Sequence, residues 1–167
     1  SYAEAAAIVD GGHTALVFLR DQGKISNQQK VLIYGASGSV GTAAIQLAKA
    51  YGAEVTGVCS TGNIEMINSL GVDRAIDYTK DDFTQEDKKY DLIFDAVAKR
   101  SFSQCKKVLT ENGRYLTTFP TPEVLFKGLV QSKRKGKRAL FVAAGVRPVG
   151  EKVKNLDYLS ELIQNHK

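Results

Sequence analysis

The chain has 167 residues, with 43% hydrophobic and 25% charged side chains, a formal net charge of +5, two cysteines and two histidines. This is the size and composition of one ordinary globular domain, and no apolar run approaches the ~20 residues that a membrane span requires. The cysteines form no C-x-x-C pair, so no zinc site can be assembled at a recognisable spacing. The basic charge favours anionic partners such as nucleotides or RNA, without indicating a fold.

The first segment, residues 2–20, is rich in helix-forming residues. Gly11 and Gly12 interrupt it, and the apolar run that follows predicts a second helix capped near Thr14. No basic region precedes the apolar residues and charged residues interrupt them, so we expect no signal peptide. The cytoplasm, or otherwise an organelle matrix, is the expected location.

Residues 30–52, KVLIYGASGSVGTAAIQLAKAYG, combine an apolar run, a turn with three glycines and a helical pattern. The run 31–34 is typical of a strand buried on both faces of a parallel sheet. Gly35, Gly38 and Gly41 follow it, and apolar residues then recur at helical spacing. We therefore expect a strand, a turn and a helix in that order.

A turn of this kind suits a pyrophosphate. Backbone N–H groups at a helix start have no intrahelical partner and carry about half a positive charge, which stabilises an anion. Gly35 would make the tight turn, Gly38 would let the backbone approach the phosphates, and Gly41 would let the helix pack against its strand. Ser37 and Ser39 add hydroxyls. Glycine-rich turns also occur as plain connectors, so the interpretation depends on the neighbouring segments.

The rest of the chain predicts alternating strands and helices. The expected strands are 54–59, 74–78, 90–97, 113–119 and 138–144, and the expected helices are 64–70, 101–109 and 156–164. Six strands with the glycine turn after the first indicate a doubly wound α/β sheet, the Rossmann fold, with strand order 3-2-1-4-5-6 and helices on both faces. Ligands then bind beyond the carboxyl ends of the strands. The candidate residues there are 35–41, those after the second strand, 95–97, 119–120 and 141–143.

The residues after the second strand bear on the choice of nucleotide. An acidic residue there would accept the ribose 2′-OH of NAD and repel the 2′-phosphate of NADP. Residues 59–63, CSTGN, offer hydroxyl and amide groups instead, which favours NADP(H) over NAD(H) and disfavours a methyltransferase-like sheet. Gly62 leaves this segment without the cation that a strong phosphate contact needs. None of the seven tyrosines has a lysine four residues on, which excludes a short-chain dehydrogenase.

Five motifs follow in order: GASGSVG at 35–41, AIQLAK at 44–49, LGVD at 70–73, IDY at 76–78 and YD at 90–91. In this order they resemble the medium-chain dehydrogenase/reductase superfamily, in its zinc-independent quinone oxidoreductase branch, and the resemblance covers essentially the whole chain. In that family a GroES-like domain precedes the cofactor domain. The resemblance therefore implies that residues 1–167 are a dinucleotide-binding domain without its GroES-like partner domain, and that no zinc is bound.

The resemblance also implies an activity: hydride transfer from NADPH to a quinone or an activated alkene or carbonyl, with little activity in the isolated domain. It places the pyrophosphate against Gly38, Ser39 and Val40, within a turn that also contains Gly35, Ala36, Ser37 and Gly41. It places the 2′-phosphate and adenosine ribose among Ser60, Thr61, Asn63 and Tyr78, and the nicotinamide end near Thr14, Val97, Phe119 and Phe141. It identifies no general acid.

Other partners are considered from two further segments. The basic segment 127–138, with KRK at 133–135, is compatible with a non-enzymatic module that binds RNA or another polyanion. A solvated loop before the sixth strand is favoured over that module, so nucleic acid is not the expected partner. In relatives the sixth strand pairs across a dimer, and residues 139–143 are therefore a candidate edge for a homodimer.

Overall fold

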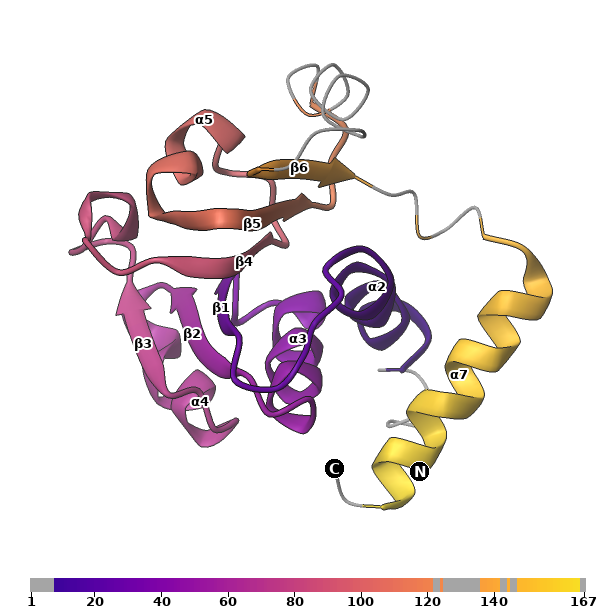
Figure 1. Cartoon of the computed structure of the whole chain (residues 1–167). Coiled ribbons are helices and arrows are strands. Elements are labelled where there is room, and N and C mark those ends of the chain that lie inside the picture. The colour runs from indigo at the N-terminus through magenta and orange to yellow at the C-terminus, as the bar shows by residue number, and fades with distance from the viewer. Residues whose placement is uncertain (1–7, 122–123, 125–135, 142–143, 145–146, 166–167) are drawn as a thin grey trace.

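The structure, a computed structural model, describes residues 8–121, 124, 136–141, 144 and 147–165. These residues form a six-stranded sheet of order β3-β2-β1-β4-β5-β6 in which all neighbouring strands are parallel (Figure 1). The strands are β1 (Lys30–Tyr34), β2 (Glu54–Cys59), β3 (Arg74–Asp77), β4 (Tyr90–Asp95), β5 (Leu109–Thr117) and β6 (Arg138–Phe141). The predicted fold class and strand order are confirmed.

The helices connect the strands and cover the sheet on both faces. They are α2 (His13–Leu16), α3 (Ser39–Ala50), α4 (Ile64–Ser69), α5 (Phe102–Cys105) and α7 (Val149–Gln164). Short helical turns are η1 (Ile8–Gly12), η2 (Val17–Gln22), η3 (Thr61–Asn63), η4 (Phe83–Gln85) and η5 (Lys106–Val108). Figure 1 shows α2 and α3 on one side of the sheet and α5 on the other.

Strand β1 illustrates why the sheet is stable. Val31 and Ile33 point into the core under α2, α3 and α4, whereas Leu32 and Tyr34 point into the core on the α5 side. This alternation follows from the two-residue period of a strand, and it requires every residue of the run to be apolar. Burial of each such aliphatic side chain contributes about 1.5–3 kcal/mol.

The N-terminal segment does not contain the second helix predicted to begin near Thr14. The backbone is helical from Ile8 to Gln22 without a break, and Gly12 itself has helical angles of φ −64° and ψ −49°. Gly11 is buried, and a Cβ added to it would lie 2.5 Å from Ser39 Oγ. Gly11 therefore permits a close approach between this helix and α3, and the two glycines do not mark a helix boundary.

Several other predicted boundaries were wrong. Helix α7 begins at Val149 and not at residue 156, and its apolar residues Val149 and Val153 are exposed outside the core. The helix predicted over 101–109 is confirmed to within one residue at each end, as α5 followed by η5, whereas β5 begins at Leu109 and not at residue 113. Strand β6 ends at Phe141, and residues 142–143 of the predicted strand lie outside the described residues.

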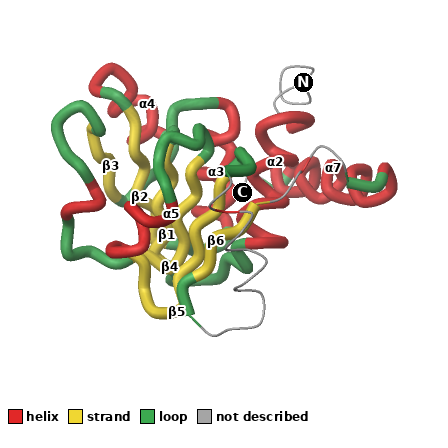
Figure 2. Tube along the Cα trace, turned by 90° about the horizontal axis from the view of Figure 1, so that it is seen from above, coloured by secondary structure: helices red, strands yellow, loops and turns green. Residues whose placement is uncertain are grey.

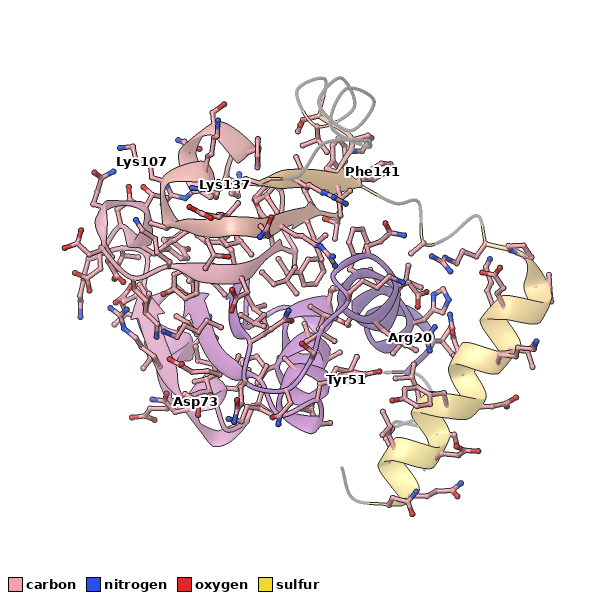
Figure 3. All side chains as sticks on the ribbon, in the orientation of Figure 1. Arg20, Tyr51, Asp73, Lys107, Lys137 and Phe141 are labelled. Carbon is pink, nitrogen blue, oxygen red and sulfur yellow. The ribbon has the colours of Figure 1, made fainter. Side chains whose placement is uncertain are left out.

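Helix α7 packs beside α2 at the flank of the molecule, as Figure 2 shows. Arg20 Nη2 donates to Asn155 Oδ1 of α7 at 2.7 Å, and the hydroxyls of Tyr51 and Tyr158 are 3.0 Å apart. Figure 3 shows the Arg20 and Tyr51 side chains on the side of the molecule that faces α7. None of the helices in the described part of the chain has the length and apolar character needed to cross a membrane.

Candidate functional site

A cavity of about 610 Å³ lies at the carboxyl ends of β1, β2, β3 and β4. This edge of a doubly wound sheet, beside the switch point between β1 and β4, is where ligands bind in such folds. The lining residues are Tyr34, Gly35, Ser37, Gly38, Cys59, Ser60, Asn63, Tyr78, Val97, Lys99 and Arg100. Seven of the residues predicted for the cofactor site are among them: Gly35, Ser37, Gly38, Ser60, Asn63, Tyr78 and Val97.

The three glycines of the turn meet different surroundings. Gly35 has φ +80°, a left-handed conformation that side chains rarely adopt, and a Cβ there would also lie 2.7 Å from Val97 Cγ1. A Cβ at Gly41 would overlap the Gly35 carbonyl oxygen and the Ala36 backbone. A Cβ at Gly38 would meet nothing of the protein closer than 3.5 Å. Gly35 and Gly41 thus permit the backbone geometry, whereas Gly38 leaves space in the cavity.

Helix α3 begins at this turn with its N-terminus uncapped by any side chain. Gly38 is the N-cap residue, and its carbonyl accepts the first helical hydrogen bond, from Thr42 N at 2.8 Å. The amides of the first turn, at Ser39, Val40 and Gly41, have no intrahelical acceptor and are available to an anion. Gly38, the residue before these amides, lines the cavity, and a helix start beside a cavity suits a phosphate.

The two hydroxyl side chains after β2 have different surroundings: Ser60 lines the cavity, whereas Thr61 is hydrogen-bonded to the protein. Asn63 Nδ2 donates to Ser60 Oγ at 3.0 Å, so the Ser60 hydroxyl can still donate its own hydrogen to a ligand. Thr61 is exposed, does not line the cavity, and donates its hydroxyl to Asp77 Oδ2 at 2.5 Å. Thr61 therefore supports Asp77 and has no hydrogen left for a phosphate.

Asp77 is a buried carboxylate at the end of β3. Hydrogen bonds from the Thr61 hydroxyl and then the Thr79 hydroxyl lower its pKa to about 2. The backbone N–H of Thr79 donates to the same carboxylate at 3.0 Å. This network fixes the chain on either side of the Tyr78 ring, which is 48% exposed at the cavity.

The loop after β4 is anchored by Asp95, a carboxylate with no exposed surface. Its oxygens accept hydrogen bonds from the backbone N–H groups of Val97 at 3.2 Å and Arg100 at 2.8 Å, and from the Tyr115 hydroxyl at 3.0 Å. Burial and then the charge of Asp95 raise the pKa of Tyr115, which keeps the hydroxyl protonated as a donor. A buried carboxylate with this many donors fixes the loop at the cavity.

Four lining residues were not predicted: Tyr34, Cys59, Lys99 and Arg100. Tyr34 and Cys59 are the last residues of their strands, so their positions pointed to the cavity edge. Lys99 and Arg100 follow the fourth strand by only a few residues, and the candidate set stopped just before them. Their position beyond the carboxyl end of a strand, together with their charge, could have identified them from the sequence as candidate site residues.

Other predicted residues lie outside the cavity. Ala36 is fully buried beneath the turn, and Ser39, Val40 and Gly41 form the first turn of α3. Thr14 belongs to α2, Phe119 follows β5 with 65% of its surface exposed, and Phe141 ends β6. Figure 3 shows Phe141 at the end of β6, on the side of the molecule away from Asp73 near β3. In the part of the chain that the structure describes, no group of His, Cys, Asp or Glu side chains is placed to hold a metal ion.

Comparison with known proteins agrees with this geometry. The family model described as "Zinc-binding dehydrogenase" matches residues 39–118. The chloroplast envelope quinone oxidoreductase homolog of Arabidopsis thaliana is 31% identical over 99% of this chain and 52% of its own length. The chain belongs to the medium-chain dehydrogenase/reductase superfamily.

Two further relatives of this superfamily are informative. The NADPH-dependent alkenal/one oxidoreductase of Arabidopsis thaliana is 40% identical over 59% of this chain and 26% of its own length. The crystal structure of CurK enoyl reductase superposes with a TM-score of 0.84 at 26% identity, covering 100% of this chain and 53% of that one. The chain thus spans about half the length of the quinone oxidoreductase homolog and of CurK enoyl reductase. The comparisons do not support a polyanion-binding module, and residues 127–135 of its basic segment lie outside the described residues.

Proposed function

We propose that this chain binds NADPH in the cavity and forms the cofactor-binding half of an oxidoreductase that reduces a quinone or an activated alkene or carbonyl. The observation that carries the proposal is the cavity at the carboxyl ends of the strands, where Gly38 leaves open space beside the uncapped start of α3. The names of the relatives, a quinone oxidoreductase and an NADPH-dependent alkenal/one oxidoreductase, support the reaction class.

Each part of the cavity then has a role. The free amides of Ser39, Val40 and Gly41 would bind the pyrophosphate, together with the open backbone at Gly38. Ser60, Asn63 and Tyr78 would contact the adenosine ribose and its 2′-phosphate. Preference for NADP(H) follows from the absence of an acidic side chain among the lining residues, because a carboxylate there would repel the 2′-phosphate.

When bound, the reduced nicotinamide supplies a hydride, and a proton from a separate donor completes the reduction of the quinone or alkene. The chain's own contribution is to bind and orient. Thr14, Phe119 and Phe141 are proposed to border the nicotinamide end, and Val97 lies against Gly35 at the turn. A GroES-like domain in the parent protein would supply the rest of the substrate site, which agrees with the half-length coverage of the relatives. Pairing of β6 with a second copy stays a proposal that sedimentation can test.

Calorimetric titration of the 167-residue chain with NADPH and NADH tests the proposal. We expect binding of both, with the smaller Kd for NADPH. A smaller Kd for NADH would contradict the NADP(H) preference alone. No heat of binding and no shift in melting temperature with either dinucleotide at millimolar concentration would contradict the assignment of the cavity as a cofactor site.

A further inference from the structure

The cavity carries a positive charge that its glycine turn and β2 do not supply. Among the described residues, its lining contains two cations, Lys99 and Arg100, and no acidic side chain. Both cations come from the loop after β4, on the opposite side of the cavity from the segment after β2. Gly62 leaves the segment after β2 without a cation, and a Cβ built there would meet no atom within 4 Å. The charge needed for a phosphate is therefore present, but on a different strand end.

The side chain of Arg100 is held by the protein itself. Its guanidinium carbon lies 5.4 Å from the centre of the Tyr34 ring and 5.5 Å from that of Phe83. One guanidinium nitrogen is 3.4 Å from Asp82 Oδ1, and 20% of the side chain is exposed. The aromatic rings and the ion pair fix this cation as part of the cavity wall and partly neutralise it.

Lys99 differs from its neighbour. It is exposed and lines the cavity, and no carboxylate of the described residues lies within ion-pair distance of its ammonium group. Its backbone is fixed: Lys99 N donates to Asp95 Oδ1 at 3.4 Å, and Ala98 before it has φ +52°, a conformation uncommon in a residue with a Cβ. The loop thus directs an unneutralised cation to a cavity that has no acid of its own.

We propose that Lys99 binds a phosphate of the dinucleotide and takes the role of the cation that is missing at Gly62. This inference rests on the proposed function, and it assigns the charge contact to the β4 side of the cavity. The phosphate is either the 2′-phosphate or the pyrophosphate, and the two dinucleotides distinguish them, because NADH lacks the 2′-phosphate.

The test compares Lys99→Ala with Lys99→Arg and with Lys30→Ala in the 167-residue chain. Lys30 is an exposed lysine at the opposite end of β1, so its removal deletes the same charge far from the cavity. We expect Lys99→Ala to raise the Kd of NADPH about tenfold, because charge-assisted hydrogen bonds to phosphate are among the strong ones. Lys99→Arg should stay within about threefold of the unmodified chain, and Lys30→Ala within about twofold.

The pattern of losses identifies the phosphate. A loss with NADPH alone assigns Lys99 to the 2′-phosphate, and an equal loss with NADH assigns it to the pyrophosphate. The dependence of log Kd on log salt should also become shallower in Lys99→Ala. Unchanged affinity for both dinucleotides in a Lys99→Ala chain of native melting temperature would overturn this inference and leave the proposed function intact. If the unmodified chain binds neither dinucleotide, the proposed function fails first.

Discussion

The two halves of the sheet's carboxyl edge differ in how completely this chain builds them. Around β1, β2, β3 and β4 the loops close on one another through Asp95, Asp77 and the glycine turn, and they enclose a cavity. None of its lining residues comes from β5 or β6, and beyond β5 Phe119 is largely exposed. The difference shows that hydrogen bonds within this chain preorganise the cavity, where we propose that the adenosine and pyrophosphate bind, whereas the β5–β6 end of the edge is exposed.

The largest effect is expected from removal of the Asp95 anchor. Asp95→Ala leaves the backbone N–H groups of Val97 and Arg100 without their acceptor, which should cost about 3 kcal/mol of unfolding free energy. The Tyr115 hydroxyl keeps the Arg100 carbonyl oxygen as an acceptor. Asp91→Ala, at the amino end of the same strand, is the matched control and should cost about 1 kcal/mol. Urea unfolding measures both, and equal losses would show that the β4 loop is not specially anchored.

The two glycines of the turn should separate stability from binding. Gly41→Ala should lower the free energy of unfolding by about 2 kcal/mol, because its methyl group overlaps the backbone at Gly35 and Ala36. Gly38→Ala should cost about 1 kcal/mol or less, as an N-cap change, yet weaken NADPH binding at least tenfold by filling the space beside the amides. Chemical unfolding and calorimetry of both variants test this, and tight NADPH binding by Gly38→Ala would contradict a cofactor at the turn.

The Asp77 network predicts a specific loss of stability in acid. The pKa of Asp77 in the folded chain, about 2, lies below the ordinary value of 3.8. The stabilisation from its ionised form is therefore complete above about pH 4 and is lost as the pH falls toward 2. Asp77→Asn should flatten the fall in melting temperature across this interval. Asp81→Asn changes an exposed neighbour and should leave this fall in melting temperature unchanged. Identical plots of melting temperature against pH for the unmodified chain and both variants would contradict the role of the Asp77 network.

The smallest effect is expected at the β5 end. Phe119→Ser should change the free energy of unfolding by less than about 0.5 kcal/mol, because the ring is 65% exposed. Although we propose that Phe119 borders the nicotinamide in the parent protein, its ring lies outside the cavity of this chain, so the Kd of NADPH should stay within about twofold of that of the unmodified chain. A rise in the Kd of NADPH of more than about fivefold, measured by calorimetry, would show that the β5 end already binds the nicotinamide. Both halves of the sheet's carboxyl edge would then take part in binding.

Residue patterns predicted the architecture and the edge of the sheet at which the cavity lies, because both depend on local rules. Strands β1 and β4 are continuous apolar runs, and the glycine spacing at 35–41 specifies a turn before a helix. The start of α7 was missed although Val149 and Val153 are four residues apart, because both side chains are more than half exposed and the prediction relied on the buried face of the helix. The glycines at 11 and 12 resembled a helix break, because nothing local reveals that Ser39 lies against Gly11.

The side chains that surround the cavity were harder to predict than the glycine turn. Thr61 was itself a predicted binding residue, yet its hydroxyl donates to Asp77, which is 16 positions away along the chain. Lys99 reaches the cavity through a loop whose shape is set by Asp95 and by the left-handed Ala98. Neither a contact between two strand ends nor a loop held by a buried carboxylate leaves a periodic pattern in the residues.

The close contact between Gly11 and Ser39 has a mechanical consequence. Because Gly11 has no side chain, its backbone lies directly against the hydroxyl and the carbonyl oxygen of Ser39. Ser39 is the first residue of α3, whose first-turn amides have no intrahelical acceptor. A side chain at position 11 would therefore displace the start of α3, and these amides would move with it.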